Sequence, residues 1–231
     1  MQKPHAVIIG VGDGLSAALA RNLAADHALT LAARSGDKMA AVAVETGAET
    51  VLLDATDEDV VANLFAALPA PPRVVIYNPS ARVRGPIAEL SADDVRRAVE
   101  VTAIGAFLTA KHAAKRMLAA EPIDGTRGTI LFTGASAGVK GFPQSAPFAM
   151  GKFAQRGLAE SMARELHPQG IHVAWINIDG AILNPGRAEP ADAPGSMLRP
   201  EAIARTYRHL IEQDRSAWTH EVAVRPWVER F

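Results

Sequence analysis

The feature that most constrains the fold of this chain is an alternation of two kinds of segment along its length. Short runs rich in β-branched and other apolar residues are separated by longer segments of Ala, Leu and charged residues. This alternation is typical of repeated strand–helix units that build a parallel sheet covered on both faces, and continuous apolar runs indicate strands buried on both sides. We therefore expect an α/β fold, a doubly wound sheet with helices on both faces. The seven predicted strands are residues 6–10, 28–33, 50–54, 73–77, 129–133, 171–176 and 221–224.

Helical patterns fill the intervals between these strands. Leu15, Leu19 and Leu23 recur every four residues, so they lie on one buried stripe of a first helix. Two further helix starts show a hydroxyl residue three positions before an acid, the spacing of a capping box. These pairs are Thr56 with Asp59 and Ser91 with Asp94.

The later part of the chain contains one long helical segment and one long irregular one. Residues 92–120 exceed the usual helix length, which predicts two helices or one bent helix. Residues 184–200 contain four prolines and two glycines, which predicts a long loop on the substrate side of the fold. Pro200 suits the first turn of the helix that follows. We find no linker or repeat, so residues 1–231 are expected to form one domain.

Composition removes several classes of function. The 231 residues carry 24 basic and 25 acidic side chains, and this net charge of −1 favours neither nucleic acid nor an anionic membrane as partner. The chain lacks cysteine, which excludes disulfides, thiolate metal sites and a cysteine nucleophile. The seven histidines lack the spacing of a metal motif, so we expect no metal. Without a signal sequence or long apolar stretch, we expect a soluble cytoplasmic protein.

A glycine-rich turn between the first strand and the first helix is the strongest local motif. Gly10, Gly12 and Gly14 precede Leu15 and Ser16. Glycines allow a tight turn and let backbone N–H groups approach a diphosphate at the helix N-terminus, where the helix dipole favours negative charge. The spacing departs from G-x-G-x-x-G, because Leu15 stands where the third glycine belongs. A plain tight turn is the alternative interpretation.

The N-terminal half resembles the short-chain dehydrogenase/reductase family, whose fingerprint is Thr-Gly-x-x-x-Gly-x-Gly. Gly10 and Gly14 match two of the three family glycines, while Ser16 replaces the third. The resemblance extends over nearly the full chain. Asp54 stands where the family acid meets the adenine, Asn78 falls in the segment Tyr-Asn-Pro-Ser that replaces the family's Asn-Asn-Ala-Gly, and Lys152 fits the family's Tyr-x-x-x-Lys.

The end of the second strand indicates which nicotinamide cofactor is used. An acid at this point binds the ribose 2′-hydroxyl and repels a 2′-phosphate. Here the chain has Arg34 and Ser35, which can form charge-assisted bonds to a phosphate, so NADP(H) is favoured over NAD(H). Asp13, at a position that is often basic in NADP-preferring relatives, argues mildly the other way. Arg34 as an ordinary solvated charge is the alternative.

The resemblance also assigns the catalytic positions, and most of them are altered. In the family a Tyr donates the proton, a Lys lowers the pKa of that Tyr and binds the nicotinamide ribose, a Ser positions the carbonyl, and an Asn supports a water relay. Here Phe148 replaces the Tyr, Lys152 is retained, Thr102 replaces the Asn, and the Ser position is Ala135 with Ser136 beside it. Phe148 then forms an apolar wall beside the nicotinamide.

The loss of a general acid costs about 100- to 10,000-fold in rate, so ordinary alcohol or ketone chemistry should be impaired. We expect an atypical NADP(H)-dependent oxidoreductase that transfers a hydride to or from a small carbonyl or alcohol substrate. The alternative is a catalytically weak relative that binds nucleotide and acts in sensing or scaffolding. The residues expected near the carboxyl edge of the sheet that can supply or relay a proton are Ser136, Thr102, Ser145, Tyr77 and Asp179. Asp179, which alters the family's Pro-Gly pair, is also a candidate cofactor contact.

Two further patterns suggest other properties. Gly134-Ala135-Ser136-Ala137-Gly138 matches the nucleophile elbow of a hydrolase, with Asp179 and His220 as partners in the order of a triad, but Gly141 and Pro143 oppose the helix that must follow the serine. Aromatic residues gather near the C-terminus, either as core or as a subunit contact: Trp218, Trp227 and Phe231. Family members are usually dimers or tetramers, so a homodimer or homotetramer is expected.

Overall fold

The computed structural model describes residues 3–229. Within them, seven parallel strands form one sheet in the order β3-β2-β1-β4-β5-β6-β9. Every predicted strand is present, with bounds that differ by two residues at most. These strands are β1 (His5–Ile9), β2 (Ala28–Ala33), β3 (Glu49–Leu52), β4 (Val74–Tyr77), β5 (Gly128–Thr133), β6 (Ile171–Ile178) and β9 (Glu221–Val224).

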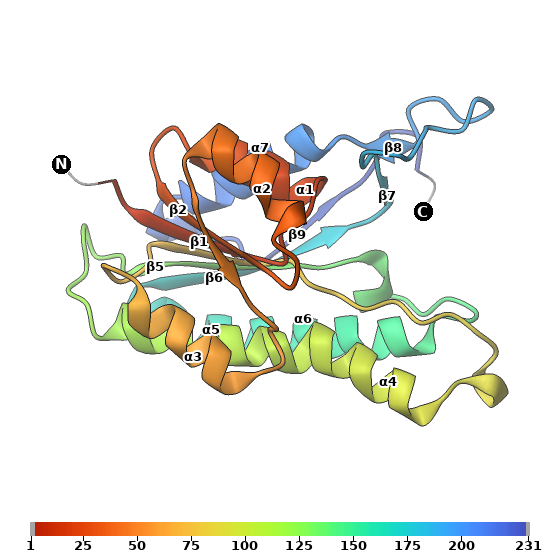
Figure 1. The fold of residues 1–231 in the computed structure, drawn as a ribbon, viewed down its shortest axis with the longest axis horizontal. Coiled ribbons are helices and arrows are strands. Elements are labelled where there is room, and N and C mark those ends of the chain that lie inside the picture. Colours follow the sequence, from red (N-terminus) through yellow and green to blue (C-terminus); the bar gives the residue numbers. More distant parts are fainter. Residues whose placement is uncertain (1–2, 230–231) are drawn as a thin grey trace.

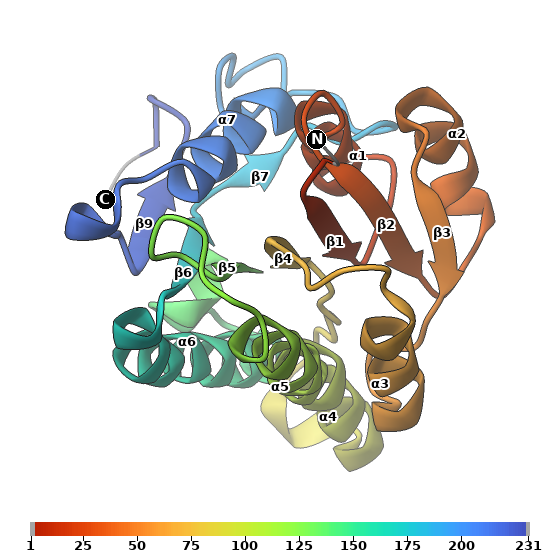
Figure 2. The same ribbon diagram turned by 90° about the vertical axis from the view of Figure 1, so that its left-hand side faces the viewer.

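Helices cover both faces of this sheet (Figures 1 and 2). One face carries α1 (Leu15–Leu23), α2 (Asp37–Thr46) and α7 (Pro200–Ile211), and the other carries α3 (Glu58–Ala67), α4 (Ala92–Val99), α5 (Gly105–Leu118) and α6 (Ala146–Leu166). Successive side chains of a strand alternate between the two layers. Ala6 and Ile8 pack with the α1 and α7 core, while Val7 and Ile9 pack with the α5 and α6 core. The doubly wound fold is confirmed.

The helix starts follow the sequence with one correction. Helix α4 is capped by Ser91, whose side chain accepts a hydrogen bond from the Asp93 N–H, and α7 begins at Pro200 as predicted. The prediction of Thr56 as a cap is wrong. Asp57 caps α3 by accepting from the N–H groups of Asp59 and Val60, because the Thr56 hydroxyl is already bonded to Asp54.

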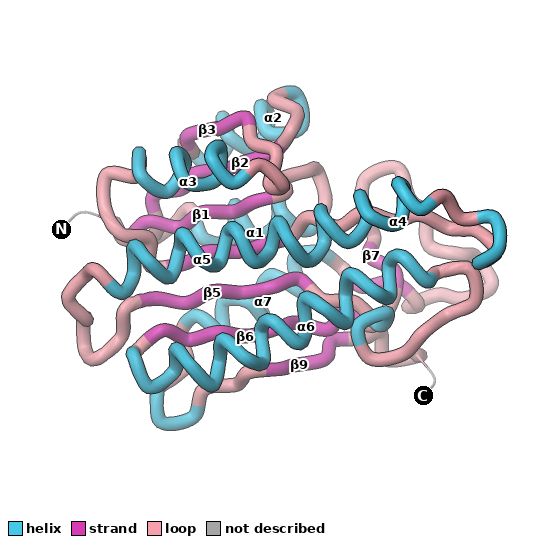
Figure 3. The backbone as a smooth tube through the Cα atoms, turned by 90° about the horizontal axis from the view of Figure 1, so that it is seen from below, coloured by secondary structure: helices cyan, strands magenta, loops and turns pink. Residues whose placement is uncertain are grey.

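The long segment 92–120 is one rod interrupted by a π-helix. Helix α4 runs into a π-helical segment (Glu100–Ile104) and then α5, and Figure 3 shows the two helices nearly in line beside α6. The wider turn requires compensation for its backbone groups. The buried Tyr77 hydroxyl donates to the Val101 carbonyl oxygen, and Gly105 lets the helix lie against Tyr77. Burial raises the pKa of Tyr77, so this hydroxyl keeps its proton.

Two expectations about buried strands and loops need correction. Strand β3 lies at one edge of the sheet and is mostly exposed, so it is not buried on both sides: Leu52 is 66% exposed. Residues 184–200 are mainly loop, but they also contain β8 (Met197–Leu198), which pairs in parallel with β7 (Ala181–Ile182). A two-residue pairing leaves no periodic signal in the sequence, which is why it was missed.

The strand order reverses between β1 and β4, which extend the sheet in opposite directions. Ligands of open parallel sheets bind outside the carboxyl ends of strands at such a point. The glycine turn after β1 and the loop after β4 both begin here. No helix within residues 3–229 has the length and apolar character needed to cross a membrane.

Candidate cofactor and active site

Two adjoining cavities lie at this carboxyl edge. The larger, of about 810 Å³, extends from the glycine turn to Phe148 and Lys152. The smaller, of about 540 Å³, lies over the ends of β2 and β3, between Arg34 and Asp54. The residues shared by both linings are Gly10, Val11, Lys38, Asn78 and Ser80. The two cavities therefore form one groove across the switch point of the sheet.

The glycine turn presents a free helix terminus to this groove. Gly10 has a φ of 85°, and a Cβ there would lie 2.7 Å from the Pro79 ring. Nothing lies within 4 Å of a Cβ built on Gly12, so this side of the turn is open. Gly14 is the N-cap of α1, with no side-chain cap and no acid in the first turn of the helix. Free N–H groups at a helix N-terminus fit a diphosphate, and the predicted residues Gly10, Gly12, Gly14 and Leu15 all line the cavity, together with the acid Asp13.

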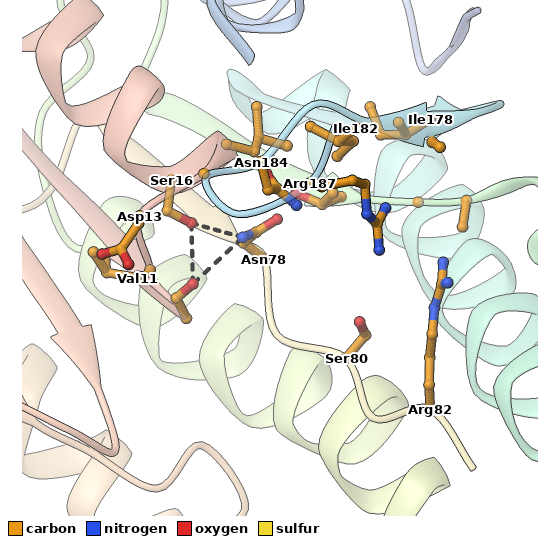
Figure 4. Close-up of a pocket in the computed structure, with 18 of the residues that line it drawn as sticks. Val11, Asp13, Ser16, Asn78, Ser80, Arg82, Ile178, Ile182, Asn184 and Arg187 are labelled. Carbon is orange, nitrogen blue, oxygen red and sulfur yellow. Dashed lines mark hydrogen bonds between the residues drawn. The ribbon is translucent and has the colours of Figure 1, made fainter. Parts of the chain in front are cut away.

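Ser16 holds the glycine turn in place by hydrogen bonds (Figure 4). Its hydroxyl donates to the Gly10 carbonyl oxygen over 3.0 Å and accepts from the Asn78 amide over 2.6 Å. The same amide also lies 3.3 Å from the Gly10 oxygen. Ser16 is 1% exposed. Ser16 thus ties β1, α1 and the loop after β4 together at the groove.

Asn184 lies directly over Gly14, a contact that the sequence analysis missed. A Cβ on Gly14 would overlap the Asn184 side-chain oxygen. That oxygen is buried and accepts no hydrogen bond from the described residues. A buried acceptor without a partner is unusual, because most buried polar atoms are hydrogen-bonded. The only hint in the sequence was the position of Asn184 at the start of the predicted loop 184–200.

The smaller cavity contains the residues predicted for cofactor choice. Arg34, Ser35 and Asp54 line the smaller cavity, together with Lys38 from the first turn of α2. The N–H and hydroxyl of Thr56 donate to Asp54 and hold the pKa of that carboxyl below its ordinary value. Asp54 is therefore an ionised acceptor at neutral pH. Lys38 was missed because a lysine in an exposed helix turn has no distinguishing pattern.

Lys152 lies at the other end of the groove and is 2% exposed. Its ammonium group donates to the Thr133 carbonyl oxygen over 2.5 Å and to the Gln155 side-chain oxygen over 3.2 Å. Burial, with a smaller contribution from the positive charge of Arg82, lowers the pKa of Lys152 to about 7. Two of the three donor positions of an ammonium group are used, which leaves one for the cavity.

Phe148 lies one turn before Lys152 in α6 and faces the same cavity. The guanidinium of Arg82, from the loop after β4, stacks on the Phe148 ring at 4.4 Å from the ring centroid. Arg187, from the loop after β7, lines this cavity as well. Neither arginine was singled out from the sequence, because both lie in loops without periodic pattern. Phe148 is thus a wall of the cavity, and a cation lies over its ring.

Three predicted site residues do not line the groove. Thr102 is fully buried behind it, where its hydroxyl accepts from the Ala81 N–H. Ser136 begins a 3-10 helix (Ser136–Gly138) beside Ala135, and Ala135 rather than Ser136 lines the cavity. Asp179 forms an ion pair with Arg225 at 3.3 Å. Two other proposed proton sources, Tyr77 and Ser145, are also absent from the lining.

The hydrolase arrangement is not formed. Ser136 leads into a 3-10 turn and a loop, and the next helix starts only at Ala146. Asp179 follows the carboxyl end of β6, whereas His220 precedes the amino end of β9. These two ends of the sheet are separated by a four-residue strand, about 13 Å long. His220 therefore lies at the opposite end of β9 from Asp179, so the three side chains do not form a triad. Among residues 3–229, no group of three or more His, Asp or Glu side chains is placed to hold a metal ion.

Comparison with known proteins identifies the family. Residues 4–184 match the family described as short chain dehydrogenase. The chain belongs to the short-chain dehydrogenase/reductase family. The resemblance seen in the sequence is confirmed, and the family is one of oxidoreductases.

Individual relatives agree with this family membership. The cyclic-di-GMP-binding biofilm dispersal mediator protein of Escherichia coli is 31% identical over 81% of this chain and 76% of its own length. A short-chain dehydrogenase structure from Rhodopseudomonas palustris is 35% identical, with a TM-score of 0.79 over 96% of this chain and 99% of the other. An alcohol dehydrogenase from Thermococcus sibiricus, solved with 5-hydroxy-NADP, has 24% identity and a TM-score of 0.84 over 99% of both chains.

Proposed function

We propose that this protein is an atypical NADP(H)-dependent oxidoreductase that transfers a hydride to or from a small carbonyl or alcohol substrate. The observation that carries this proposal is the groove at the switch point. It joins an uncapped helix N-terminus at Gly14 to a buried Lys152 across the carboxyl ends of β1, β4 and β5. A dinucleotide needs a diphosphate site and a sugar site joined in this way.

The residues present fit a nicotinamide dinucleotide. The N–H groups of Gly14 and Leu15 would hold its diphosphate, Asp54 its adenine, and Lys152 its nicotinamide ribose. When bound, this cofactor supplies or accepts the hydride. The alcohol dehydrogenase structure from Thermococcus sibiricus contains such a molecule, which supports the assignment by analogy of fold.

The preference for NADP(H) rests on the charge at the end of β2. Arg34, Ser35 and Lys38 line the smaller cavity and present two cations and a hydroxyl to a 2′-phosphate. A charge-assisted pair of this kind favours phosphate over a hydroxyl group. The nearest acid of the lining, Asp54, is satisfied by Thr56.

We propose that Lys152 transfers the proton that accompanies the hydride. Phe148 has no exchangeable proton, and Ser136 and Thr102 do not line the cavity. A pKa near neutral pH suits a general acid or base, and the unused donor position of the Lys152 ammonium group is available for it. In this scheme Gln155 and the Thr133 carbonyl oxygen are positioning groups, because they fix the direction of the ammonium group.

The surroundings of the site complete the proposal. Residues 184–200 form the substrate-side loop, since Asn184, Pro185 and Arg187 line the larger cavity.

We retain a cytoplasmic homodimer or homotetramer as the expected form. Of the aromatic residues first considered for an interface, Trp218 stacks on His172 at 5.0 Å, Trp227 is 88% exposed, and Phe231 lies outside the described residues.

An activity assay tests this function. A panel of small aldehydes, ketones and 2-oxo acids is mixed with NADPH, and turnover is followed by the loss of nicotinamide absorbance. We expect turnover of at least one compound that exceeds the rate of a Lys152→Met variant. Tight NADPH binding without turnover across the panel would instead favour the sensing or scaffolding role. That alternative finds no support in the family match itself.

A further inference from the structure

The substrate end of the groove contains two arginines that the proposed chemistry does not use. Arg82 comes from the loop after β4, and Arg187 comes from the loop after β7. Both line the larger cavity, and Figure 4 shows their side chains extending toward each other from different walls of it. They are separated by more than 100 residues in the sequence, so only the fold brings them together.

These two cations are not balanced by acids. Within residues 3–229, none of the ion pairs includes Arg82 or Arg187. The acid among the residues that line this cavity is Asp13, which lies beside the glycine turn and away from Arg82 (Figure 4). Burial lowers the pKa of Arg82, and the positive charges of Arg187 and Arg84 lower it further. Two like charges at one cavity repel each other unless an anion lies between them.

Arg82 is exposed, but its guanidinium has a defined neighbour. It lies over the Phe148 ring, which is 6% exposed, with 4.4 Å between the guanidinium carbon and the ring centroid. A cation over a ring face is attracted by the ring, and this contact uses none of the N–H donors of Arg82. A planar, preoriented set of donors matches the oxygen atoms of a carboxylate or phosphate group.

We propose that Arg82 and Arg187 form an anion subsite, so that the substrate carries a carboxylate or phosphate group held beside Phe148. As a statement about the substrate, this inference rests on the proposed function. The subsite lies at the Phe148 end of the groove, whereas the diphosphate site lies at the N-terminus of α1. The two anions therefore occupy different parts of the cavity, and binding of each can be measured separately.

Calorimetric titration of three probes tests this subsite. Benzoate presents a carboxylate, phenyl phosphate presents a phosphate, and benzamide is a neutral probe of similar shape to benzoate. Each is added to the full chain with and without saturating NADP⁺, and to the variants Arg82→Gln and Arg187→Gln. Arg84→Gln is the matched control, because Arg84 lies in the same loop and its charge also acts on Arg82, but it does not line the cavity.

We expect at least one anion to bind the NADP⁺-loaded protein about tenfold or more tightly than benzamide. Arg82→Gln and Arg187→Gln should each weaken the binding of that anion about tenfold, whereas Arg84→Gln should change it less than twofold. The affinity for NADP⁺ should change less than twofold in all three variants. The tighter of the two anions identifies the group that the substrate carries. Equal binding of benzamide, or equal losses in Arg84→Gln, would overturn the subsite.

The same titrations separate this inference from the proposed function. If NADP⁺ does not bind but benzoate or phenyl phosphate still binds in an Arg82-dependent way, the subsite stands and the oxidoreductase proposal fails. If NADP⁺ binds and anion binding is unaffected by Arg82→Gln, the anion lies elsewhere and the subsite is wrong. Circular dichroism of each variant checks that the fold is intact.

Discussion

The guanidinium carbon of Arg82 lies 4.4 Å from the ring centroid of Phe148, the residue that the sequence resemblance aligns with the catalytic tyrosine of the family. A positive charge therefore covers a ring that has no hydroxyl group. Phenylalanine has no proton to donate, and here its ring forms one wall of the larger cavity and lies against a cation.

Restoring the tyrosine tests whether Phe148 limits the chemistry. Phe148→Tyr should raise kcat/KM for carbonyl reduction about tenfold or more, because a general acid typically contributes at least that much. Phe153→Tyr is the matched control, since Phe153 lies on the same helix, is 45% exposed and does not line the cavity. No gain in a well-folded Phe148→Tyr protein would contradict this expectation and would show that proton transfer by Lys152 already suffices.

Arg34 should determine the choice between the two cofactors. Arg34→Ala is expected to weaken NADPH binding about tenfold while changing NADH binding less than twofold, since the lost interaction is with the 2′-phosphate. Fluorescence titration of both nucleotides measures this ratio. Arg205→Ala, at an exposed position in α7, serves as the control. Equal small losses for NADPH and NADH would remove the NADP assignment.

Ser16 should contribute to stability through its two hydrogen bonds. Ser16→Ala removes the donor to Gly10 and leaves the Asn78 amide with one partner fewer. A buried polar group that loses a partner costs about 1 to 3 kcal/mol, so the free energy of unfolding in urea should fall by that amount. Ser161→Ala, at an exposed position in α6, should change the free energy of unfolding by less than about 0.5 kcal/mol, as is usual for surface substitutions. A similar small change for Ser16→Ala would show that the bonds add little.

Lys152 should make stability depend on pH. Its pKa is about 7 in the folded protein and near 10.5 in the unfolded chain, so between these values the unfolded chain binds one more proton. The unfolding free energy of the parent should therefore rise with pH, relative to Lys152→Met, by at most about 1.4 kcal/mol per pH unit. Urea unfolding at pH 7, 8 and 9 gives this difference. A difference that does not change with pH would show that Lys152 titrates normally.

The fold was predictable because its signals are local. The apolar runs of the seven strands and the glycine turn before Leu15 depend on neighbouring residues alone. The exposed strand β3 was misjudged because Val51 and Leu52 are apolar, and position at the sheet edge is set by strand order rather than by composition.

The Phe148 end of the larger cavity was predicted less well. Phe148 and Lys152 follow from their spacing on one helix, but Arg82, Arg187 and Asn184 reach the cavity from irregular loops. Their positions depend on the tertiary path of those loops and leave no periodic pattern in the sequence. The ion pair of Asp179 with Arg225 likewise depends on the pairing of β6 with β9, two segments more than 40 residues apart.

The central claim is that the groove from Gly14 to Lys152 binds a nicotinamide dinucleotide. Isothermal titration calorimetry of NADPH into the folded full-length chain tests it most directly. The account predicts saturable binding of one molecule per chain, about tenfold or more weaker in a Lys152→Met variant of unchanged circular dichroism. The absence of any binding heat, with NADPH and with NADP⁺, would contradict it.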